Sequence, residues 1–115
     1  MCVFFGDPDL ASSWLPRFRA MPGVEVVQGS PENIEVTAAG VDKGEALLTL
    51  ADRLGIPRAQ TLAVGDSEND RAMLEKAGTA AVMANGMEHI KALADYVSEA
   101  DCDHDGVAEI FRKLV

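Results

Sequence analysis

The stretch Leu62-Ala63-Val64-Gly65-Asp66-Ser67-Glu68-Asn69-Asp70 decides how most of this chain is interpreted. Residues 61–64 form a short apolar run, which is typical of a strand buried on both faces of a parallel sheet. The run ends at Gly65, and the polar residues Asp66, Asn69 and Asp70 follow where a turn is expected. In open α/β sheets ligands bind beyond the carboxyl ends of the strands. This turn is therefore a candidate binding site.

Helical and extended patterns alternate on both sides of this turn. Strands are expected at 61–64, 80–83 and 96–97, and helices before, between and after them, the last carrying Val107, Ile110, Phe111 and Leu114 at helical spacing. The alternation predicts an α/β fold, a parallel sheet with flanking helices. Residues 1–36 differ, because short strands and one helix capped by Asp7 predict a small α+β unit. We expect two parts, 1–36 and 37–115.

Composition narrows the classes of partner. The 115 residues include 19 acidic and 10 basic side chains, which give a net charge of −9. This balance disfavours nucleic acid and anionic membranes as partners, because both attract clustered Lys and Arg. The chain has no basic leader and no run of roughly 20 apolar residues that could span a bilayer. We therefore expect a cytoplasmic protein.

The spacing of the two carboxylates suggests a metal. Asp66 and Asp70 are four residues apart, so a tight turn could bring both near one point. Hard oxygen donors of this kind suit Mg²⁺, which takes one or two carboxylates plus waters and phosphate oxygens. Asp and Asn after a strand are also ordinary turn and capping residues. The turn by itself leaves both interpretations open.

Lys43 bears on this choice, although its position alone is equally consistent with an ordinary solvated lysine on the surface. It lies in the first turn of an expected helix, beside Asp42. Lysine normally prefers the other end of a helix, since the helix dipole makes the N-terminus positive. A cation next to free backbone N–H groups is a poor local arrangement but a good site for an anion.

Together these segments resemble the Cof-type (subclass IIB) phosphatases of the haloacid dehalogenase (HAD) superfamily. Residues 41–47 are similar to that family's lysine motif, and residues 62–70 to its acidic GDxxND motif. Further matches follow in order at 82–86, 94–97 and 105–108. The resemblance covers residues 33–115, and residues 1–32 look like the closing part of a cap domain. It implies a HAD-like Rossmannoid parallel sheet, here partial, plus a small α+β remnant of the cap.

The resemblance also implies roles for individual residues. Asp66 and Asp70 would form the Mg²⁺ site, Asp66 as a ligand and Asp70 as a support that orients waters or Lys43. Lys43 and Asn69 would bind the phosphoryl group, and Lys43 and Asp70 would be the catalytic residues. The implied substrates are small phosphorylated metabolites such as sugar phosphates. These roles suit phosphoryl transfer, which depends on positioning and charge stabilisation.

The family's nucleophile, an aspartate in an N-terminal DxD motif, has no clear counterpart here. Asp7-Pro8-Asp9 has the DxD spacing, but a glycine-containing flap and a long cap do not follow it. We therefore expect an incomplete chain that retains a half-site and cannot form an aspartyl-phosphate. A sheet without its first strand would expose an edge, so we also expect a homodimer through that edge.

Two other functions compete with a phosphatase. One is a non-enzymatic regulatory or assembly module that keeps only the fold. The other is a receiver-like domain, which the chain order disfavours because a receiver's acidic residues precede its lysine. Elsewhere, we expect His89 and the loop 102–105 to be solvated surface, and Trp14 and Phe18 to be core of the small unit.

Overall fold

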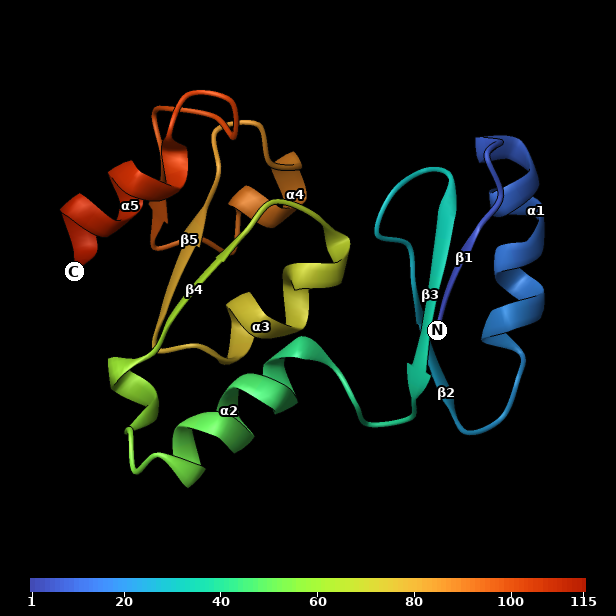
Figure 1. Ribbon diagram of the computed structural model, residues 1–115, viewed down its shortest axis with the longest axis horizontal. Coiled ribbons are helices and arrows are strands. Elements are labelled where there is room, and N and C mark those ends of the chain that lie inside the picture. Colours follow the sequence, from blue (N-terminus) through green and yellow to red (C-terminus); the bar gives the residue numbers. More distant parts are fainter. The chain divides into compact units, whose positions relative to one another are not determined.

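The computed structural model describes residues 1–115, and the chain divides into two compact units, Met1–Asp42 and Lys43–Val115 (Figure 1). The division lies six residues beyond the expected one, which fell between residues 36 and 37. The reason is the third strand of the first unit, which stays paired as far as Ala38. Each unit has its own core and is described by itself.

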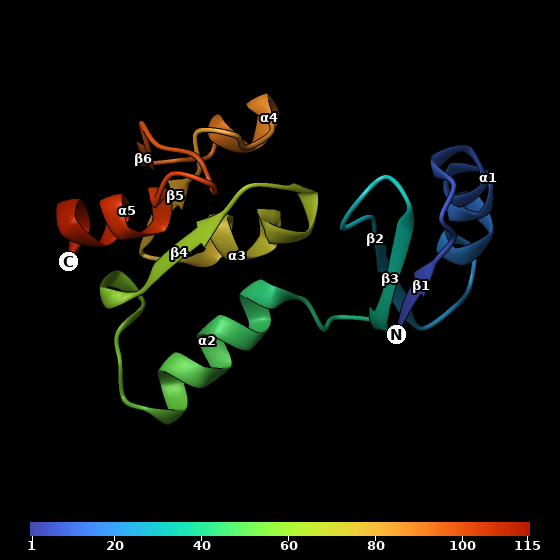
Figure 2. The ribbon, with the colours of Figure 1, turned by 45° about the horizontal axis from the view of Figure 1, so that its top comes forward.

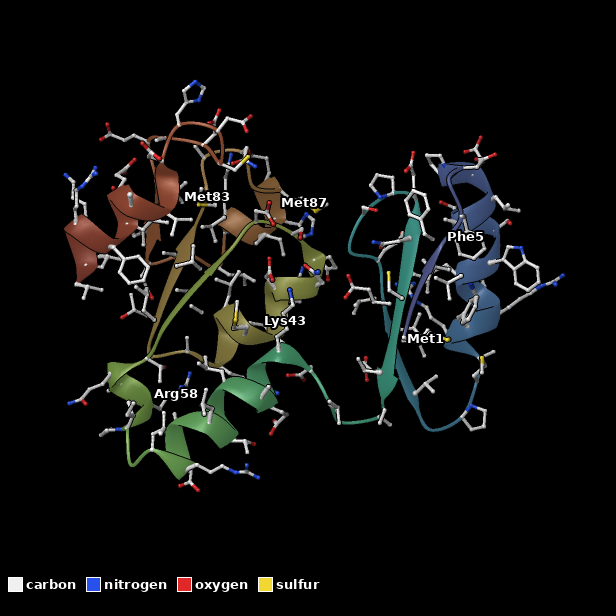
Figure 3. All side chains as sticks on the ribbon, viewed as in Figure 1. Met1, Phe5, Lys43, Arg58, Met83 and Met87 are labelled. Carbon is white, nitrogen blue, oxygen red and sulfur yellow. The ribbon has the colours of Figure 1, made fainter.

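The first unit is a three-stranded antiparallel sheet with one helix. Its elements are β1 (Cys2–Phe4), α1 (Pro8–Arg19), β2 (Val24–Val27) and β3 (Asn33–Ala38), and the strand order is β1-β3-β2. The core joins sheet and helix and contains Val26, Ile34 and Val36, with Phe5, Leu15, Phe18 and Val24 packed against it (Figure 3 labels Phe5). This is the small α+β unit that the sequence predicted.

Helix α1 begins as expected, but the burial of one of its side chains differs from the prediction. The Asp7 carboxylate accepts hydrogen bonds from the backbone N–H groups of Asp9 and Leu10, at 2.8 and 3.3 Å, which makes Asp7 the N-cap. The helix continues through Pro16. The expectation that Trp14 belongs to the core is wrong, since Trp14 is 40% exposed and its ring lies 4.8 Å from the guanidinium carbon of Arg17.

The second unit alternates helices and strands. Its elements are α2 (Lys43–Arg53), η1 (Arg58–Gln60), β4 (Leu62–Gly65), η2 (Glu68–Asp70), α3 (Arg71–Lys76), β5 (Thr79–Val82), α4 (Glu88–Lys91), β6 (Tyr96–Val97) and α5 (Gly106–Leu114). The strands form a parallel sheet in the order β4-β5-β6. Parallel neighbours need crossover connections, which α3 and α4 provide. The α/β expectation is therefore confirmed.

Helices lie on both sides of the parallel sheet (Figure 2), and alternate residues of its strands pack against one side or the other. On one face Ala63, Ala80 and Val82 pack with Leu74 of α3 and Ile90 of α4. The opposite face meets α5, and there Ala81 and Met83 pack with Ile110, joined by Leu62, Val64 and Tyr96. Burial on both faces explains why these strands are continuous apolar runs instead of alternating ones.

The apolar face of α5 is wider than the surface that covers it. Ile110 is fully buried, but Val107 and Phe111 are 49% and 53% exposed and Leu114 is 39% exposed. Strand β4 forms one edge of the sheet. The apolar periodicity therefore predicted α5 correctly. About half of the surface of its outer apolar side chains, however, is left uncovered by the chain.

A carboxylate on α5 holds the loop that follows β6. Glu109 accepts a hydrogen bond from the Tyr96 hydroxyl and from the backbone N–H groups of Glu99 and Ala100. These donors, that of Tyr96 foremost, lower the pKa of Glu109, and the same contact raises the pKa of Tyr96 to about 12. The hydroxyl thus stays protonated as a donor at neutral pH.

No helix of the chain is long and apolar enough to cross a membrane. The two cysteines, Cys2 and Cys102, are free thiols on the surface.

Candidate active site

The acidic turn after β4 is held together by one buried carboxylate. Asp70 is only 7% exposed, and its Oδ2 accepts a hydrogen bond of 3.1 Å from the backbone N–H of Asp66. Its Oδ1 lies 2.6 Å from Nζ of Lys43 (Figure 3 labels Lys43). The structure therefore brings together Lys43, Asp66 and Asp70, whose cooperation the sequence suggested.

Close packing of two helices delivers Lys43 to this turn. Lys43 is the first residue of α2, and the next residue is Gly44. A methyl group on Gly44 would lie 2.3 Å from the carbonyl oxygen of Ala72 in α3, well inside van der Waals contact. Glycine thus lets α2 approach α3 closely enough for the lysine to reach Asp70.

Gly65 makes a second close approach, inside the turn itself. A methyl group there would lie 2.6 Å from Cβ of Asp70 and 2.9 Å from its Oδ2. Because that oxygen already accepts from Asp66, a side chain at Gly65 would displace the carboxylate from both of its partners. The glycine at the end of β4 is required by the position of Asp70.

The loop after β5 is fastened to the same turn. The backbone N–H of Met87, labelled in Figure 3, donates to the carbonyl oxygen of Asp66 at 2.9 Å. Nε2 of His89 in α4 lies 2.8 Å from Oε2 of Glu68, and Nε of Arg71 donates a hydrogen bond of 2.8 Å to Oε1 of the same carboxylate. The Arg71 contact, followed by that of His89, lowers the pKa of Glu68 against the opposing effect of its burial. These contacts join two strand ends at the rim of the site.

Sequence reasoning placed His89 on the surface, and it is 55% exposed at the side chain. Reasoning from sequence missed its contact with Glu68. The two residues are 21 positions apart, Glu68 in η2 and His89 in α4. No local spacing links them, so only the register of β4 beside β5 reveals the pair.

Asn69 contributes an amide side chain to the turn after β4. Its Oδ1 accepts a hydrogen bond of 2.8 Å from the hydroxyl of Ser67, and its amide nitrogen donates to no protein group. Asn69 is half-buried and lies in η2, between Glu68 and Asp70. Two N–H donors of this side chain are therefore available to a ligand of the turn.

The carboxylates of the turn supply few ligands for a Mg²⁺ ion, and this small number is compatible with Mg²⁺. The chain contains no group of three or more His, Cys, Asp or Glu side chains arranged to hold a metal ion. Magnesium commonly needs only one or two carboxylates, because waters and substrate phosphate fill the other positions. Half-buried Asp66 fits as such a ligand. Both oxygens of Asp70 are already engaged, by Lys43 and by the Asp66 N–H, which suits an indirect role.

The second acidic segment, at residues 101–105, is surface. Cys102, Asp103, His104 and Asp105 are all exposed, as expected. Nδ1 of His104 lies 2.6 Å from a carboxylate oxygen of Asp101, and this hydrogen bond is the main cause of the lowered pKa of Asp101. The contact orders the loop before α5 and adds no ligand to the site.

A model of the haloacid dehalogenase-like hydrolases matches residues 2–111 of the chain. The chain belongs to this family. The match extends through both units and includes Lys43 and the turn 65–70. The HAD-like fold expected from the motifs is thereby confirmed.

Several relatives of this HAD chain are named as phosphatases. A 5-amino-6-(5-phospho-D-ribitylamino)uracil phosphatase of Bacillus subtilis is 37% identical over 109 residues, which cover 95% of this chain and 43% of the relative. A phosphoglycolate phosphatase of Methanopyrus kandleri is 35% identical over 122 residues, covering 94% of this chain and 52% of that protein. The chain thus spans about half, or less, of the length of these relatives.

Solved structures agree on the fold. A haloacid dehalogenase-like hydrolase from B. subtilis superposes with a TM-score of 0.88 at 35% identity, covering 99% of this chain and 40% of that one. A sugar phosphatase of HAD subclass IIB gives a TM-score of 0.77 at 31% identity, covering 89% and 38% of the two chains. The subclass suggested by the motifs is therefore represented among the structural relatives.

Proposed function

We propose that residues 43–115 form the metal- and phosphate-binding half of a Mg²⁺-dependent phosphoric monoester hydrolase, located in the cytoplasm. The observation that carries the proposal is the 2.6 Å contact of Lys43 with a buried Asp70, whose other oxygen holds the backbone of Asp66. This contact joins the start of α2 to η2, the turn that follows β4, two segments far apart in sequence. The proposed substrates are small phosphorylated metabolites such as sugar phosphates, the class to which the named relatives point.

Each residue has a part in this proposal. Asp66 would hold Mg²⁺, which supplies charge stabilisation for a phosphoryl group when bound. Asp70 fixes Lys43, so that the ammonium group faces the phosphoryl oxygens and neutralises their charge. Asn69 donates amide N–H groups to the same oxygens. Acting together, these residues bind and orient a phosphate monoester.

The nucleophile is proposed to come from outside these residues. The carboxylate of Asp7, the nearest sequence candidate, already caps α1 through Asp9 and Leu10. We therefore propose that this chain carries a half-site without the aspartyl-phosphate chemistry. Hydrolysis of p-nitrophenyl phosphate by the pure chain, abolished by Asp7→Asn, would contradict that part of the proposal.

Replacing Asp66 with asparagine tests the metal site. We expect Asp66→Asn to weaken Mg²⁺ binding at least tenfold, about 1.4 kcal/mol, because a charged oxygen ligand becomes a neutral one. The measurement is a Mg²⁺ titration followed by amide chemical shifts. Asp103→Asn is the matched control, since it removes the same charge from an exposed loop residue. Equal affinity of both variants would contradict the assignment of Asp66.

A second candidate is a non-enzymatic assembly module. It is favoured by the open edge of β4 and by the exposed stripe of Val107, Phe111 and Leu114 on α5. Such a module would form homodimers through that edge. The same Mg²⁺ titration separates the candidates: no binding at millimolar Mg²⁺, with a sedimentation coefficient that rises with protein concentration, would favour assembly.

A further inference from the structure

Ser67 occupies a capping position but does not cap. It is the N-cap of η2, with an extended backbone at φ −139° and ψ 176°, and its side chain accepts no hydrogen bond from the turn. Serine at this position ordinarily accepts from a backbone N–H two or three residues further on. Here the hydroxyl instead donates to Oδ1 of Asn69 at 2.8 Å. The expected local interaction has been replaced by a contact with a proposed substrate-binding side chain.

The contact determines which end of the Asn69 amide faces a ligand. An asparagine amide has an acceptor oxygen at one corner and two N–H donors at the other. With its oxygen held by Ser67, Asn69 turns its free N–H₂ group away from the hydroxyl. The opposite orientation would present the oxygen, which repels an anion. In the orientation found, with Oδ1 on the Ser67 hydroxyl, the Asn69 amide presents its N–H donors, which attract phosphate.

We propose that Ser67 is a positioning residue for phosphate binding, acting through the amide of Asn69. The inference rests on the proposed function, since it deepens the role given there to Asn69. Ser67 itself needs no contact with the ligand. Its predicted effect is confined to anion affinity, because its hydroxyl contacts neither Asp66 nor Asp70.

Binding of inorganic phosphate in the presence of Mg²⁺ tests this proposal. We expect Ser67→Ala to weaken phosphate binding about three- to tenfold, the effect of one neutral hydrogen bond. Ser67→Thr keeps the hydroxyl and should retain the affinity of the unsubstituted chain. In an Asn69→Ala background, Ser67→Ala should have no further effect, because the group it orients is gone.

A merely structural role would lower the urea midpoint or the Mg²⁺ affinity of Ser67→Ala as well. A positioning role leaves both quantities equal to those of the unsubstituted chain. An undiminished phosphate affinity in Ser67→Ala, or a loss that persists in the Asn69→Ala background, would overturn the proposal while leaving the proposed function intact. If Asn69→Ala binds phosphate as well as the unsubstituted chain, the role of Asn69 fails, and the inference fails with it.

Discussion

Gly44→Ala should destabilise the second unit by about 1–3 kcal/mol, the usual cost of forcing a methyl group into a filled space. Alanine in a helix normally gains up to roughly 1 kcal/mol over glycine, so the sign of this effect is informative. The steric term prevails because the methyl group meets the carbonyl oxygen of Ala72 at 2.3 Å and its carbon at 2.7 Å. Backbone atoms inside a helix cannot move aside as a flexible side chain can.

Urea denaturation measures this effect, with Thr49→Ala as the control. Thr49 is exposed and lies on the same helix, so its replacement should change stability by only a few tenths of a kcal/mol. Gly44→Ala should also weaken phosphate binding, because separating α2 from α3 withdraws Lys43 from Asp70. If Gly44→Ala is as stable as Thr49→Ala, the close approach of the two helices is incorrect.

The parts of the fold that could be predicted from sequence depend on local patterns. The alternation of apolar runs with helical spacing predicted a parallel sheet, because a strand followed by a helix returns in the same direction. The ends of β4 and β5 fell close to Gly65 and Asn85, where the chain changes from apolar to polar residues. The same patterns predicted the cap of α1 at Asp7, which needs only neighbouring residues.

The extent to which neighbouring elements bury the apolar face of a helix could not be predicted from such patterns. The spacing of Leu47, Leu50 and Leu54 indicates one apolar face on α2, yet Leu50 and Leu54 are 56% and 64% exposed. Periodicity shows which side chains share a face and says nothing about how much of that face a neighbour covers. Trp14 shows the same limit, since its spacing correctly predicted a helix, but its side chain is exposed where burial was predicted.

The candidate site was predicted in its residue types and only partly in its contacts. The positions of Lys43 and of the 65–70 turn suggested a shared site, and their contact at 2.6 Å agrees with that suggestion. The engagement of both Asp70 oxygens and the contact between Glu68 and His89 could not be predicted from the residue types alone. Pairing of β4 with β5 brings the loop carrying His89 beside Glu68, and no sequence spacing encodes that distance.

Lys43→Met should destabilise the chain by about 1–3 kcal/mol, the range for leaving a buried polar group without one of its partners. Methionine keeps the aliphatic part of the side chain and removes the ammonium group. The Asp70 carboxylate, whose side chain is 11% exposed, would then keep only the N–H of Asp66 as a partner. Because water cannot replace the lost partner fully at such burial, the carboxylate stays poorly solvated. The same variant should lose affinity for inorganic phosphate.

Lys91→Met is the matched control for this prediction. Lys91 also forms an ion pair, 2.9 Å from Glu88, but the Glu88 side chain is 90% exposed, so its loss should cost less than about 1 kcal/mol. Salt separates the two further, because at 1 M the screening length is about 3 Å and exposed pairs contribute little. In urea denaturation, high salt should therefore abolish the loss of stability caused by Lys91→Met and leave most of the loss caused by Lys43→Met. Equal losses in both variants at both salt concentrations would mean that Asp70 is solvated without Lys43, and the lysine would then be an ordinary surface residue.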